Sequence, residues 1–178
     1  MPRGIIGRMV AGKMEKANKT RNRWVISVLD LQPTDYVLEV GYACGMDMAR
    51  VADQVTNGLI MGVDHSETMF HLAFKRNRKL LDSGRMQLQV GPASKLPFAY
   101  AYFDKVFSID VAQYAKDPVK DFGELKRVLR PGGMAVVAME ALGDTAGPLL
   151  QKQFVQAGFE DVTLQKHEEL VCVLGRKK

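Results

Sequence analysis

Short apolar runs alternate along the chain with segments whose apolar residues recur at helical spacing. Five of the runs predict strands, over residues 36–40, 59–63, 86–90, 105–109 and 134–139. Helical spacing predicts helices over residues 17–31, 44–55, 66–84, 118–129 and 148–157. Two last runs, 161–164 and 170–174, predict a terminal antiparallel pair. Such alternation is typical of crossover units, which build a mostly parallel sheet with helices on both faces.

In sheets of this kind ligands bind beyond the carboxyl ends of the strands. The turn Gly41-Tyr42-Ala43-Cys44-Gly45 follows the first predicted strand and leaves little side chain between backbone and ligand. Asp64 ends the second strand, 23 positions beyond Gly41. A carboxylate at about this separation can accept both ribose hydroxyls of an adenosine group. Alone, the turn could be a tight connection and Asp64 a helix cap; together they favour a nucleotide site.

Five stretches carry a family resemblance, in the order and spacing of that family: VLEVGYACG (37–45), GVDHS (62–66), LPF (96–98), FDKV (103–106) and LKRVLRPGG (125–133). On these residues the chain resembles class I S-adenosylmethionine-dependent methyltransferases, particularly small bacterial ones of the ubiquinone/menaquinone C-methyltransferase-like group (methyltransferase type 11). The resemblance extends from Asn22 to Gly175. It implies a Rossmann-like α/β sandwich of three layers. Its seven-stranded sheet would have the order 3-2-1-4-5-7-6, with strand seven antiparallel.

The resemblance also implies a cofactor, S-adenosylmethionine, and a product, S-adenosylhomocysteine. It assigns the methionine end of the cofactor to the turn after the first strand, with Glu39 holding the amino group. Asp64 would bind the ribose. The complete expected set is Glu39, Gly41, Tyr42, Ala43, Gly45, Asp64, His65, Met69, Ala93, Ser94, Asp110 and Val111. Of these, Ala93 and Ser94 would lie along the adenine, and Asp110 and Val111 near the sulfur that carries the methyl group.

Three positions depart from the family pattern. Ala43 replaces the middle glycine of the first turn, which costs about 1 kcal/mol or more if its φ is positive. Pro92 replaces an aspartate that commonly accepts a hydrogen bond from the adenine amino group, and proline offers no such acceptor. Asp110 adds a negative charge near the sulfonium, where it could favour the cation or act as a base.

Methyl transfer from a sulfonium is an in-line displacement that needs alignment and exclusion of water. A proton acceptor is needed only when the nucleophile is poor. We expect Asp110 and Tyr114 to be the catalytic residues. Other proton acceptors near the expected site are Gln113, Tyr42 and His71, although His71 reads better as a surface residue. No metal-ligand spacing is present, so no metal is expected.

The net charge of +5 comes from the first 23 residues, which hold seven basic side chains and one acidic one. We therefore expect a basic N-terminal arm over 1–23 and a methyltransferase domain over 24–178. Apolar residues recur in the arm at helical spacing, so it could fold as a lid helix over the cofactor or remain a frayed tail. A second basic cluster, residues 75–79, lacks the interleaved aromatic residues of a single-strand platform and reads as a solvated helix face.

Composition narrows the class of protein. The chain is 47% hydrophobic and 25% charged, which is ordinary for a soluble globular protein. Two cysteines, Cys44 and Cys172, are too few for a disulfide framework, so we expect buried thiols and a cytoplasmic location. No transmembrane segment or signal peptide is predicted.

The expected function is methyl transfer to a small-molecule acceptor, which could be lipophilic. The alternative is a methyltransferase-fold protein with lost or repurposed chemistry, either a binding scaffold or an enzyme of another reaction such as cyclisation. Ala43 and Pro92 motivate that alternative. Nucleic acid is not favoured as a partner, and the sequence leaves the oligomeric state open, with a homodimer among the options.

Overall fold

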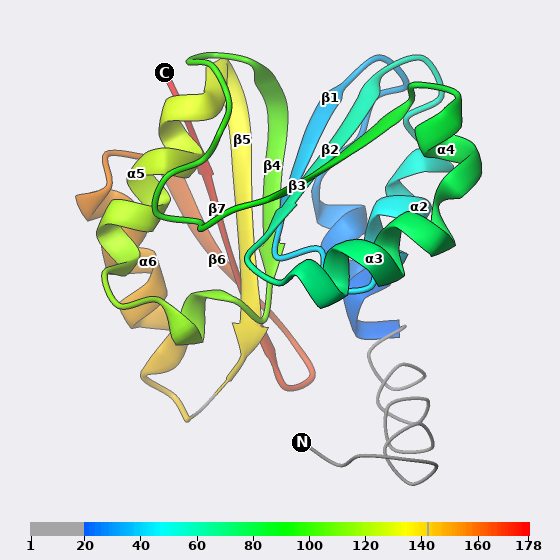
Figure 1. The fold of residues 1–178 in the computed structure, drawn as a ribbon. Helices are drawn as coiled ribbons and strands as arrows, with labels where there is room; N and C mark the ends of the chain where they lie inside the picture. The colour runs from blue at the N-terminus through cyan, green and yellow to red at the C-terminus, as the bar shows by residue number, and fades with distance from the viewer. Residues whose placement is uncertain (1–19, 142) are drawn as a thin grey trace, which may run out of the picture.

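The computed structural model describes residues 20–141 and 143–178 and contains a seven-stranded sheet of order β3-β2-β1-β4-β5-β7-β6 (Figure 1). The strands are β1 (Tyr36–Val40), β2 (Leu59–Asp64), β3 (Met86–Val90), β4 (Phe103–Ile109), β5 (Leu129–Glu140), β6 (Glu160–His167) and β7 (Leu170–Arg176). The first five strands pair in parallel, and β7 is antiparallel to both of its neighbours. The predicted fold class and strand order are confirmed.

Helices cover both faces of this sheet (Figure 1). One face carries α2 (Met46–Ala52), α3 (Glu67–Arg76) and α4 (Arg78–Asp82), and the other carries α5 (Pro118–Val128) and α6 (Ala146–Gln156). Residues 20–28 form a further helix, and a short 3-10 turn, η1 (Ala112–Tyr114), follows β4. Alternate residues of β1 supply the two separate cores, with Val37 in one and Leu38 in the other.

The central strands are buried on both faces, so their sequences are near-continuous apolar runs. Val37 and Leu38 of β1 have no exposed surface, and Val40 is 3% exposed. The exception in this strand is Glu39, a carboxylate that is also only 3% exposed. Burial of an ionisable group in an otherwise apolar strand is costly and marks the place where the site begins.

The helix predicted over 66–84 is divided in two at Asn77. The side chain of Asn77 is 4% exposed, and its Nδ2 donates to the carbonyl of Ala73 at 3.1 Å and to that of Gly45 at 2.9 Å. An asparagine side chain that hydrogen-bonds nearby backbone competes with helical hydrogen bonding, which explains the interruption. The helix predicted over 44–55 is shorter, Met46–Ala52, because Gly45 is left-handed at its N-cap.

The first described helix extends across the expected boundary between arm and domain. Residues 1–19 of the expected arm, and with them the lid hypothesis, lie outside the described residues. Arg21 and Asn22, which belong to the arm in that division, contact the rest of the domain through side-chain bonds. The boundary at residue 24 therefore stays a prediction.

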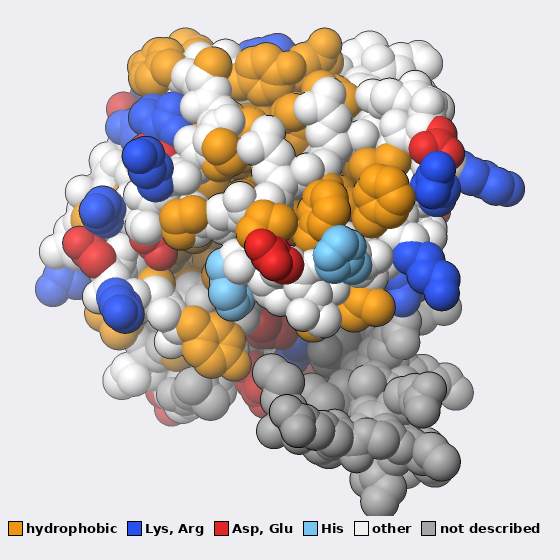
Figure 2. All heavy atoms as spheres, in the orientation of Figure 1, with side chains coloured by type: hydrophobic (Ala, Val, Ile, Leu, Met, Phe, Trp, Pro, Cys, Tyr) orange, Lys and Arg blue, Asp and Glu red, His pale blue; other side chains and the backbone are white. Residues whose placement is uncertain are grey.

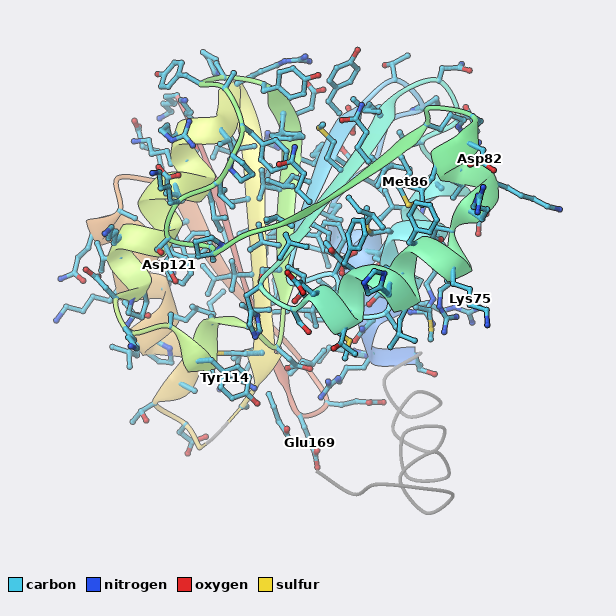
Figure 3. The ribbon with its side chains drawn as sticks, in the orientation of Figure 1. Lys75, Asp82, Met86, Tyr114, Asp121 and Glu169 are labelled. Carbon is cyan, nitrogen blue, oxygen red and sulfur yellow. The ribbon has the colours of Figure 1, made fainter. Side chains whose placement is uncertain are left out.

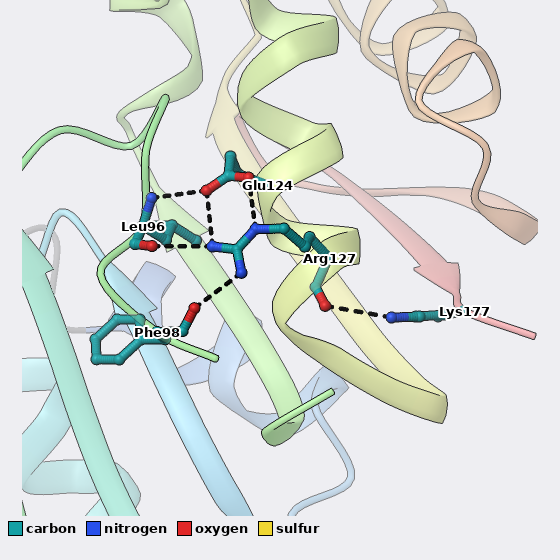
Figure 4. A network of polar contacts seen from close by, with 5 residues as sticks. All are labelled: Leu96, Phe98, Glu124, Arg127 and Lys177. Carbon is teal, nitrogen blue, oxygen red and sulfur yellow. Dashed lines mark hydrogen bonds and ion pairs between the residues drawn. The ribbon is translucent and has the colours of Figure 1, made fainter. Parts of the chain in front are cut away.

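The connection from β3 to β4, residues 91–102, contains no helix and is fastened to α5 by hydrogen bonds between its backbone and the side chains of Glu124 and Arg127 (Figure 4). Arg127 donates to the carbonyls of Phe98 at 2.8 Å and Leu96 at 2.9 Å. Glu124 accepts from Arg127 Nε at 2.6 Å and from the amide of Leu96 at 2.8 Å. The hydrogen bond from Arg127 lowers the pKa of Glu124. The segment that carries Ala93 and Ser94 is thus held by side chains of the neighbouring helix.

Candidate functional site

The turn after β1 packs directly against the end of β4. Gly41 has φ +84°, a left-handed conformation that favours glycine, and its amide donates to the carbonyl of Val63 at 2.7 Å. A Cβ at Gly41 would lie 2.2 Å from Cγ2 of Val111. No side chain fits at position 41 without displacing Val111, so the structure brings these two predicted site residues together.

The other end of the turn is confined in the same way. Gly45 has φ +71°, and a Cβ there would lie 2.5 Å from Nδ2 of Asn77 and 2.9 Å from Cβ of Ala73. Asn77 holds this end through its bond to the Gly45 carbonyl. The sequence analysis did not select Asn77. Its position on the apolar face of the predicted helix, at helical spacing from Ala73 and Leu80, was a signal that this polar side chain is buried.

Ala43, between the two glycines, has φ +47°. The φ of Ala43 is thus positive, so the cost of about 1 kcal/mol or more that was expected for an alanine at this position applies. The cost arises because a left-handed backbone strains any residue with a Cβ. The amide of Ala43 donates to Oδ2 of Asp64 at 2.9 Å, and the side chain of Ala43 is exposed. The turn keeps the shape of a glycine turn at the cost of local strain.

Asp64 is fixed by backbone bonds to both of its oxygens. Oδ2 accepts from Ala43, and Oδ1 accepts from the amide of Ser66 at 2.9 Å. The residue is 6% exposed, whereas the side chain of the adjacent His65 is 89% exposed, with Nδ1 3.5 Å from Asp64 Oδ1. Each carboxylate oxygen can accept a second hydrogen bond. Asp64 is thus oriented by the protein and still able to accept the hydroxyls of a ribose.

The side chain of Tyr42 belongs to the core. It is 2% exposed, and its hydroxyl donates to the carbonyl of Gln89 at 3.1 Å. Burial, with a smaller effect of the Asp64 charge, raises the pKa of Tyr42 to about 12. The phenol therefore stays protonated at neutral pH and does not serve as a base. Only the backbone of Tyr42 is left to contact a ligand.

Glu39 provides a test of whether the site fits the expected cofactor. One oxygen of its carboxylate accepts from the amide of Met48, while Oε2 is buried and has no partner among the described residues. Burial first, and then the charges of Asp47 and Asp64, raise the pKa of Glu39 well above its ordinary value. A buried carboxylate oxygen without a donor suits a cationic ligand group, and the ammonium of a methionyl group is one. The residues present fit the cofactor at this end.

Asp110, expected near the sulfur, is held on both carboxylate oxygens. Oδ1 accepts from the amide of Glu140 at 3.2 Å, and Oδ2 forms an ion pair with Arg21. Its φ is +57°, and its own amide donates to the carbonyl of Ala138 at 2.9 Å. Burial raises the pKa of Asp110, and the charge of Arg21 opposes that rise. The partner Arg21 was not predicted, because the sequence analysis placed it in the arm.

Tyr114, the second expected catalytic residue, lies in η1 and is 79% exposed. In Figure 3 it lies at the edge of the molecule where β5 ends, the same edge at which Glu169 is labelled. Among the described residues, no hydrogen bond, ion pair or ring contact fixes the position of its side chain. Tyr114 is thus available to an acceptor that approaches the end of β4, and a catalytic role stays a prediction.

The other predicted residues are distributed along the same edge of the sheet. Met69 packs against the core beneath α3, and its amide donates to the Ser66 hydroxyl at 3.3 Å. Ala93 and Ser94 are half-buried in the 91–102 connection, and Pro92 beside them is exposed. His71 is exposed, as expected for a surface residue.

A small, mostly apolar cavity, partly open to solvent, lies between the sheet and α5. Its lining includes Ala93, from the connection between β3 and β4, and Val111, which follows β4. Its polar groups are Ser108 and Asp121, and Asp121 is labelled on α5 in Figure 3. The full lining is Val40, Ala93, Ser108, Val111, Ala112, Ala115, Asp121, Phe122, Leu125 and Val137. Sites for small molecules have this character, apolar walls with a few polar groups.

Three further observations concern exposed apolar side chains, metal binding and membrane crossing. Figure 2 shows apolar side chains exposed on the face that α3 covers, where Leu72 is 48% and Phe74 38% exposed. The described residues contain no cluster of three or more side chains suited to hold a metal ion. None of the described helices is both long and apolar enough to cross a membrane.

The two cysteines differ from each other. Cys172 is buried in β7, and burial raises its pKa to about 12, so its thiol stays protonated. Cys44 is only partly buried, in the turn after β1. The expectation of two buried thiols is therefore correct for Cys172 and wrong for Cys44, because the turn that carries Cys44 lies at the surface of the site.

Comparisons with known proteins agree with this geometry. Residues 38–137, more than half of the chain, match the model of the family described as methyltransferase domain. The chain is 31% identical over 182 residues to the "uncharacterized methyltransferase YdaC" of Bacillus subtilis, covering 95% of this chain and 98% of that protein. An S-adenosylmethionine-dependent methyltransferase of Aquifex aeolicus has the same fold, with TM-score 0.74 and 18% identity over 86% of this chain and 88% of that one.

A further fold neighbour was solved with S-adenosyl-L-methionine: phosphoethanolamine N-methyltransferase 2 of Haemonchus contortus. It aligns with TM-score 0.77 and 18% identity over 89% of this chain and 52% of that one. The cofactor of the family is S-adenosylmethionine, and the Glu39 carboxylate and the glycine turn of this chain fit it. The chain belongs to the class I S-adenosylmethionine-dependent methyltransferases.

Proposed function

We propose that the protein transfers a methyl group from S-adenosylmethionine to a small-molecule acceptor that presents an apolar surface. The apolar cavity beside Val111 carries this proposal, because it adjoins the end of β4, where the sulfur is expected. The connection between β5 and α6 supports it. Only residues 141–145 separate these elements, which leaves no room for a large cap over the acceptor.

The cofactor would bind along the carboxyl ends of the strands. Glu39 would pair with its ammonium, and the backbone of residues 41–45 would lie against the methionyl chain. Asp64 would accept the ribose hydroxyls through the lone pairs that its backbone donors leave free. The adenosine would lie beside His65 and Met69, with the adenine along Ala93 and Ser94.

The bound cofactor supplies the electrophilic methyl group. The acceptor atom would bond this methyl carbon through its lone pair, and the electron pair of the broken carbon–sulfur bond would stay on sulfur. A proton on the acceptor atom then leaves to a base or to solvent. We assign that base to Asp110, which Arg21 and the Glu140 amide hold in one orientation, and we place Tyr114 beside the acceptor.

Calorimetric titration with S-adenosylmethionine and S-adenosylhomocysteine tests the first half of this proposal. We expect dissociation constants on the order of 1–100 µM, that is, about 5.5 to 8.2 kcal/mol of binding free energy. The variant Asp64→Leu, which removes the ribose acceptor, should lose most of this affinity. Absence of binding by the wild-type protein at roughly 1 mM cofactor would instead support the repurposed-fold alternative.

A screen of small acceptors with methyl-labelled cofactor tests the second half. Transfer to apolar small molecules that is lost with Asp64→Leu supports the proposal, and transfer only to nucleic acid or protein contradicts it. Removal of residues 1–16 examines the expected lid in the same assay. If the arm closes the acceptor site, the truncated protein should have a higher KM for the acceptor. Unchanged turnover and cofactor affinity would show that the arm is no lid.

A further inference from the structure

The helices α3 and α4 expose apolar side chains beside a dense group of basic ones. Ala73 is the buried residue of α3, and Leu72 and Phe74 on its two sides are 48% and 38% exposed. Four of the five residues 75–79 are basic, and all four are exposed. Figure 2 shows the apolar side chains on this side of the molecule, and Figure 3 labels Lys75 at its outer edge. We call these exposed residues the α3–α4 face: Leu72, Phe74, Lys75, Arg76, Arg78 and Lys79.

Contacts within this face place the two kinds of side chain next to each other. Phe74 follows Phe70 by four positions, and the centroids of their rings are 6.0 Å apart. The guanidinium of Arg78 lies over the ring of Phe74, 5.4 Å from its centroid. Lys75 follows Leu72 by three positions, a spacing that makes side chains neighbours on a helix. The apolar side chains therefore lie among the positive charges and not on a separate side.

The positive charge of the α3–α4 face is a local feature. Because the first 23 residues account for more than the net charge of +5, residues 24–178 carry a net charge of −1. Arg78 pairs with Asp82 at 3.0 Å. Lys75 and Lys79 form no ion pair or side-chain hydrogen bond with any residue that the structure describes. Uncompensated charges of one sign attract oppositely charged partners to their side of a molecule.

Three other environments of this face account for less of it. Water suits the basic side chains and leaves Leu72 and Phe74 unexplained. The phosphates of a nucleic acid bind Lys and Arg and need no apolar side chains. A second copy of this chain would cover the apolar side chains. A two-fold interface would, however, set the basic residues of one copy against those of the other.

The surface of an anionic lipid bilayer complements both kinds of side chain. Its headgroups carry negative charge, and the apolar layer begins directly beneath them. A lysine or arginine can lay its alkyl chain along apolar surface while its charged end stays among the headgroups. Interleaved basic and apolar side chains are therefore suited to this boundary.

We propose that the α3–α4 face docks on the surface of an anionic lipid bilayer, with Leu72 and Phe74 in contact with the apolar layer and Lys75 and Lys79 among the headgroups. This inference goes beyond the proposed function and does not depend on it, because docking requires neither cofactor nor acceptor. In the docked protein α5 and α6, on the other face of the sheet, are turned away from the lipid (Figure 1).

Co-sedimentation of the full chain with lipid vesicles tests the proposal. We expect binding to phosphatidylcholine vesicles that contain about 30% phosphatidylglycerol, and none to phosphatidylcholine alone. The double variant Lys75→Gln, Lys79→Gln should weaken binding by about tenfold or more, since each basic side chain at such a surface accounts for about fivefold. The double variant Leu72→Ser, Phe74→Ser should weaken it by about fivefold or more.

Matched variants on the other face of the sheet are the controls. Lys120→Gln with Lys152→Gln removes two exposed lysines from α5 and α6. Leu149→Ser with Val155→Ser removes two apolar side chains of α6 that are 55% and 57% exposed. Both double variants should bind the anionic vesicles like the wild-type protein. The basic residues 1–23 are present in every variant, so their attraction to the vesicles is common to all of them.

A fluorescence measurement examines contact with the apolar layer directly. Trp24 is the only tryptophan, so Phe74→Trp combined with Trp24→Phe reports on position 74 alone. Lipids brominated in their acyl chains should quench this tryptophan when the anionic vesicles are bound. Absence of quenching in the bound protein would overturn the proposal.

The other results that would overturn it identify what covers the face instead. Equal losses in the control variants would show a general attraction of positive charge to the vesicles. A loss with the lysine variant alone would make the face a phosphate-binding surface such as one for nucleic acid. A wild-type dimer that Leu72→Ser, Phe74→Ser converts to a monomer would assign the face to a second copy of the chain.

Discussion

The backbone amide of Ala43 donates to the carboxylate of Asp64 at 2.9 Å, joining the ends of β1 and β2 inside the proposed cofactor site. Ala43 makes this bond in a left-handed conformation, with φ +47°. Because a backbone amide makes the bond, any residue except proline could supply it, whereas the strain depends on the side chain. The site therefore combines a bond that orients Asp64 with a residue that is poorly suited to make it.

Ala43→Gly should stabilise the protein. Relief of left-handed strain amounts to about 1–2 kcal/mol, and the greater freedom of glycine in the unfolded chain offsets about 0.4–1 kcal/mol of it. We expect the free energy of unfolding to rise by about 0.5–1 kcal/mol in urea denaturation. Ala49→Gly, the same change in the middle of α2, should lower it by about 1 kcal/mol. A loss of stability for Ala43→Gly would show that the turn is not strained.

Cofactor affinity should rise with pH through the ionisation of Glu39. The ammonium of the cofactor pairs with the ionised carboxylate, while the free protein keeps a raised pKa at Glu39. Binding should therefore release a proton and strengthen from pH 4.5, the ordinary pKa of a glutamate, up to that raised pKa. Calorimetry over this range checks it. Glu39→Gln should bind more weakly at the upper end and lose the pH dependence.

The same group has the opposite effect on the stability of the free protein. Because the folded state holds the proton of Glu39 more tightly than the unfolded state, the free energy of unfolding should fall as pH rises from 4.5 to the raised pKa. Glu39→Gln should remove this decline. A decline of equal size in the variant would assign it to another group.

Arg127→Lys should loosen the connection that carries Ala93 and Ser94. Lysine cannot bond two carbonyls and Glu124 together as the planar guanidinium does. We expect a loss of about 1–3 kcal/mol in the free energy of unfolding and weaker binding of methylthioadenosine. Glu160→Gln, at an exposed ion pair with Lys178, should cost clearly less stability than Arg127→Lys.

We expect the free energy of unfolding to fall in acid because of Glu124. Its pKa is lowered by Arg127, so its contribution is present above the ordinary pKa of 4.5 and is lost as pH falls through the lowered value. Urea denaturation at a series of acidic pH values should show this slope in the wild-type protein. Glu124→Gln should flatten the slope and lower the stability at neutral pH.

Asp110→Asn should separate binding from transfer. Asparagine tolerates positive φ about as well as aspartate, so the backbone at φ +57° is kept while the ion pair with Arg21 is lost. If Asp110 is the base, kcat should fall by about 10²- to 10⁴-fold with little change in cofactor affinity. Tyr114→Phe, at an exposed side chain, tests the second assigned residue in the same assay. An unchanged kcat for Asp110→Asn would remove it from catalysis.

The strands could be predicted because parallel strands buried on both faces leave apolar runs in the sequence, whereas their order followed from the family resemblance. β1 occupies the predicted residues 36–40, and β2 extends one residue further, to Asp64. The glycine turn and Asp64 follow those runs directly, so local sequence places them at the ligand-binding edge. These parts of the site depend on neighbours in sequence.

The missed residues depend on contacts between distant segments. Arg21 meets Asp110 across 89 positions, and Asn77 meets Gly45 across 32. Helical spacing places Asn77 on the apolar face with Ala73 and Leu80, but it does not show that its side chain bonds Gly45. Tyr42 shows the converse, since its place in the turn predicted a ligand contact and its side chain packs in the core.

The position of β7 between β5 and β6 has a consequence for synthesis on the ribosome. β6 is made before β7, yet β7 is the strand with which it pairs, so β6 has no neighbour until Leu170–Arg176 has left the exit tunnel. The edge of β5 that pairs with β7 also stays unpaired until the same seven residues have left the tunnel. Until then the nascent chain carries an unpaired sheet edge, which is a template for aggregation. Translation stalled between residues 160 and 170 should therefore yield an aggregation-prone product that depends on chaperones.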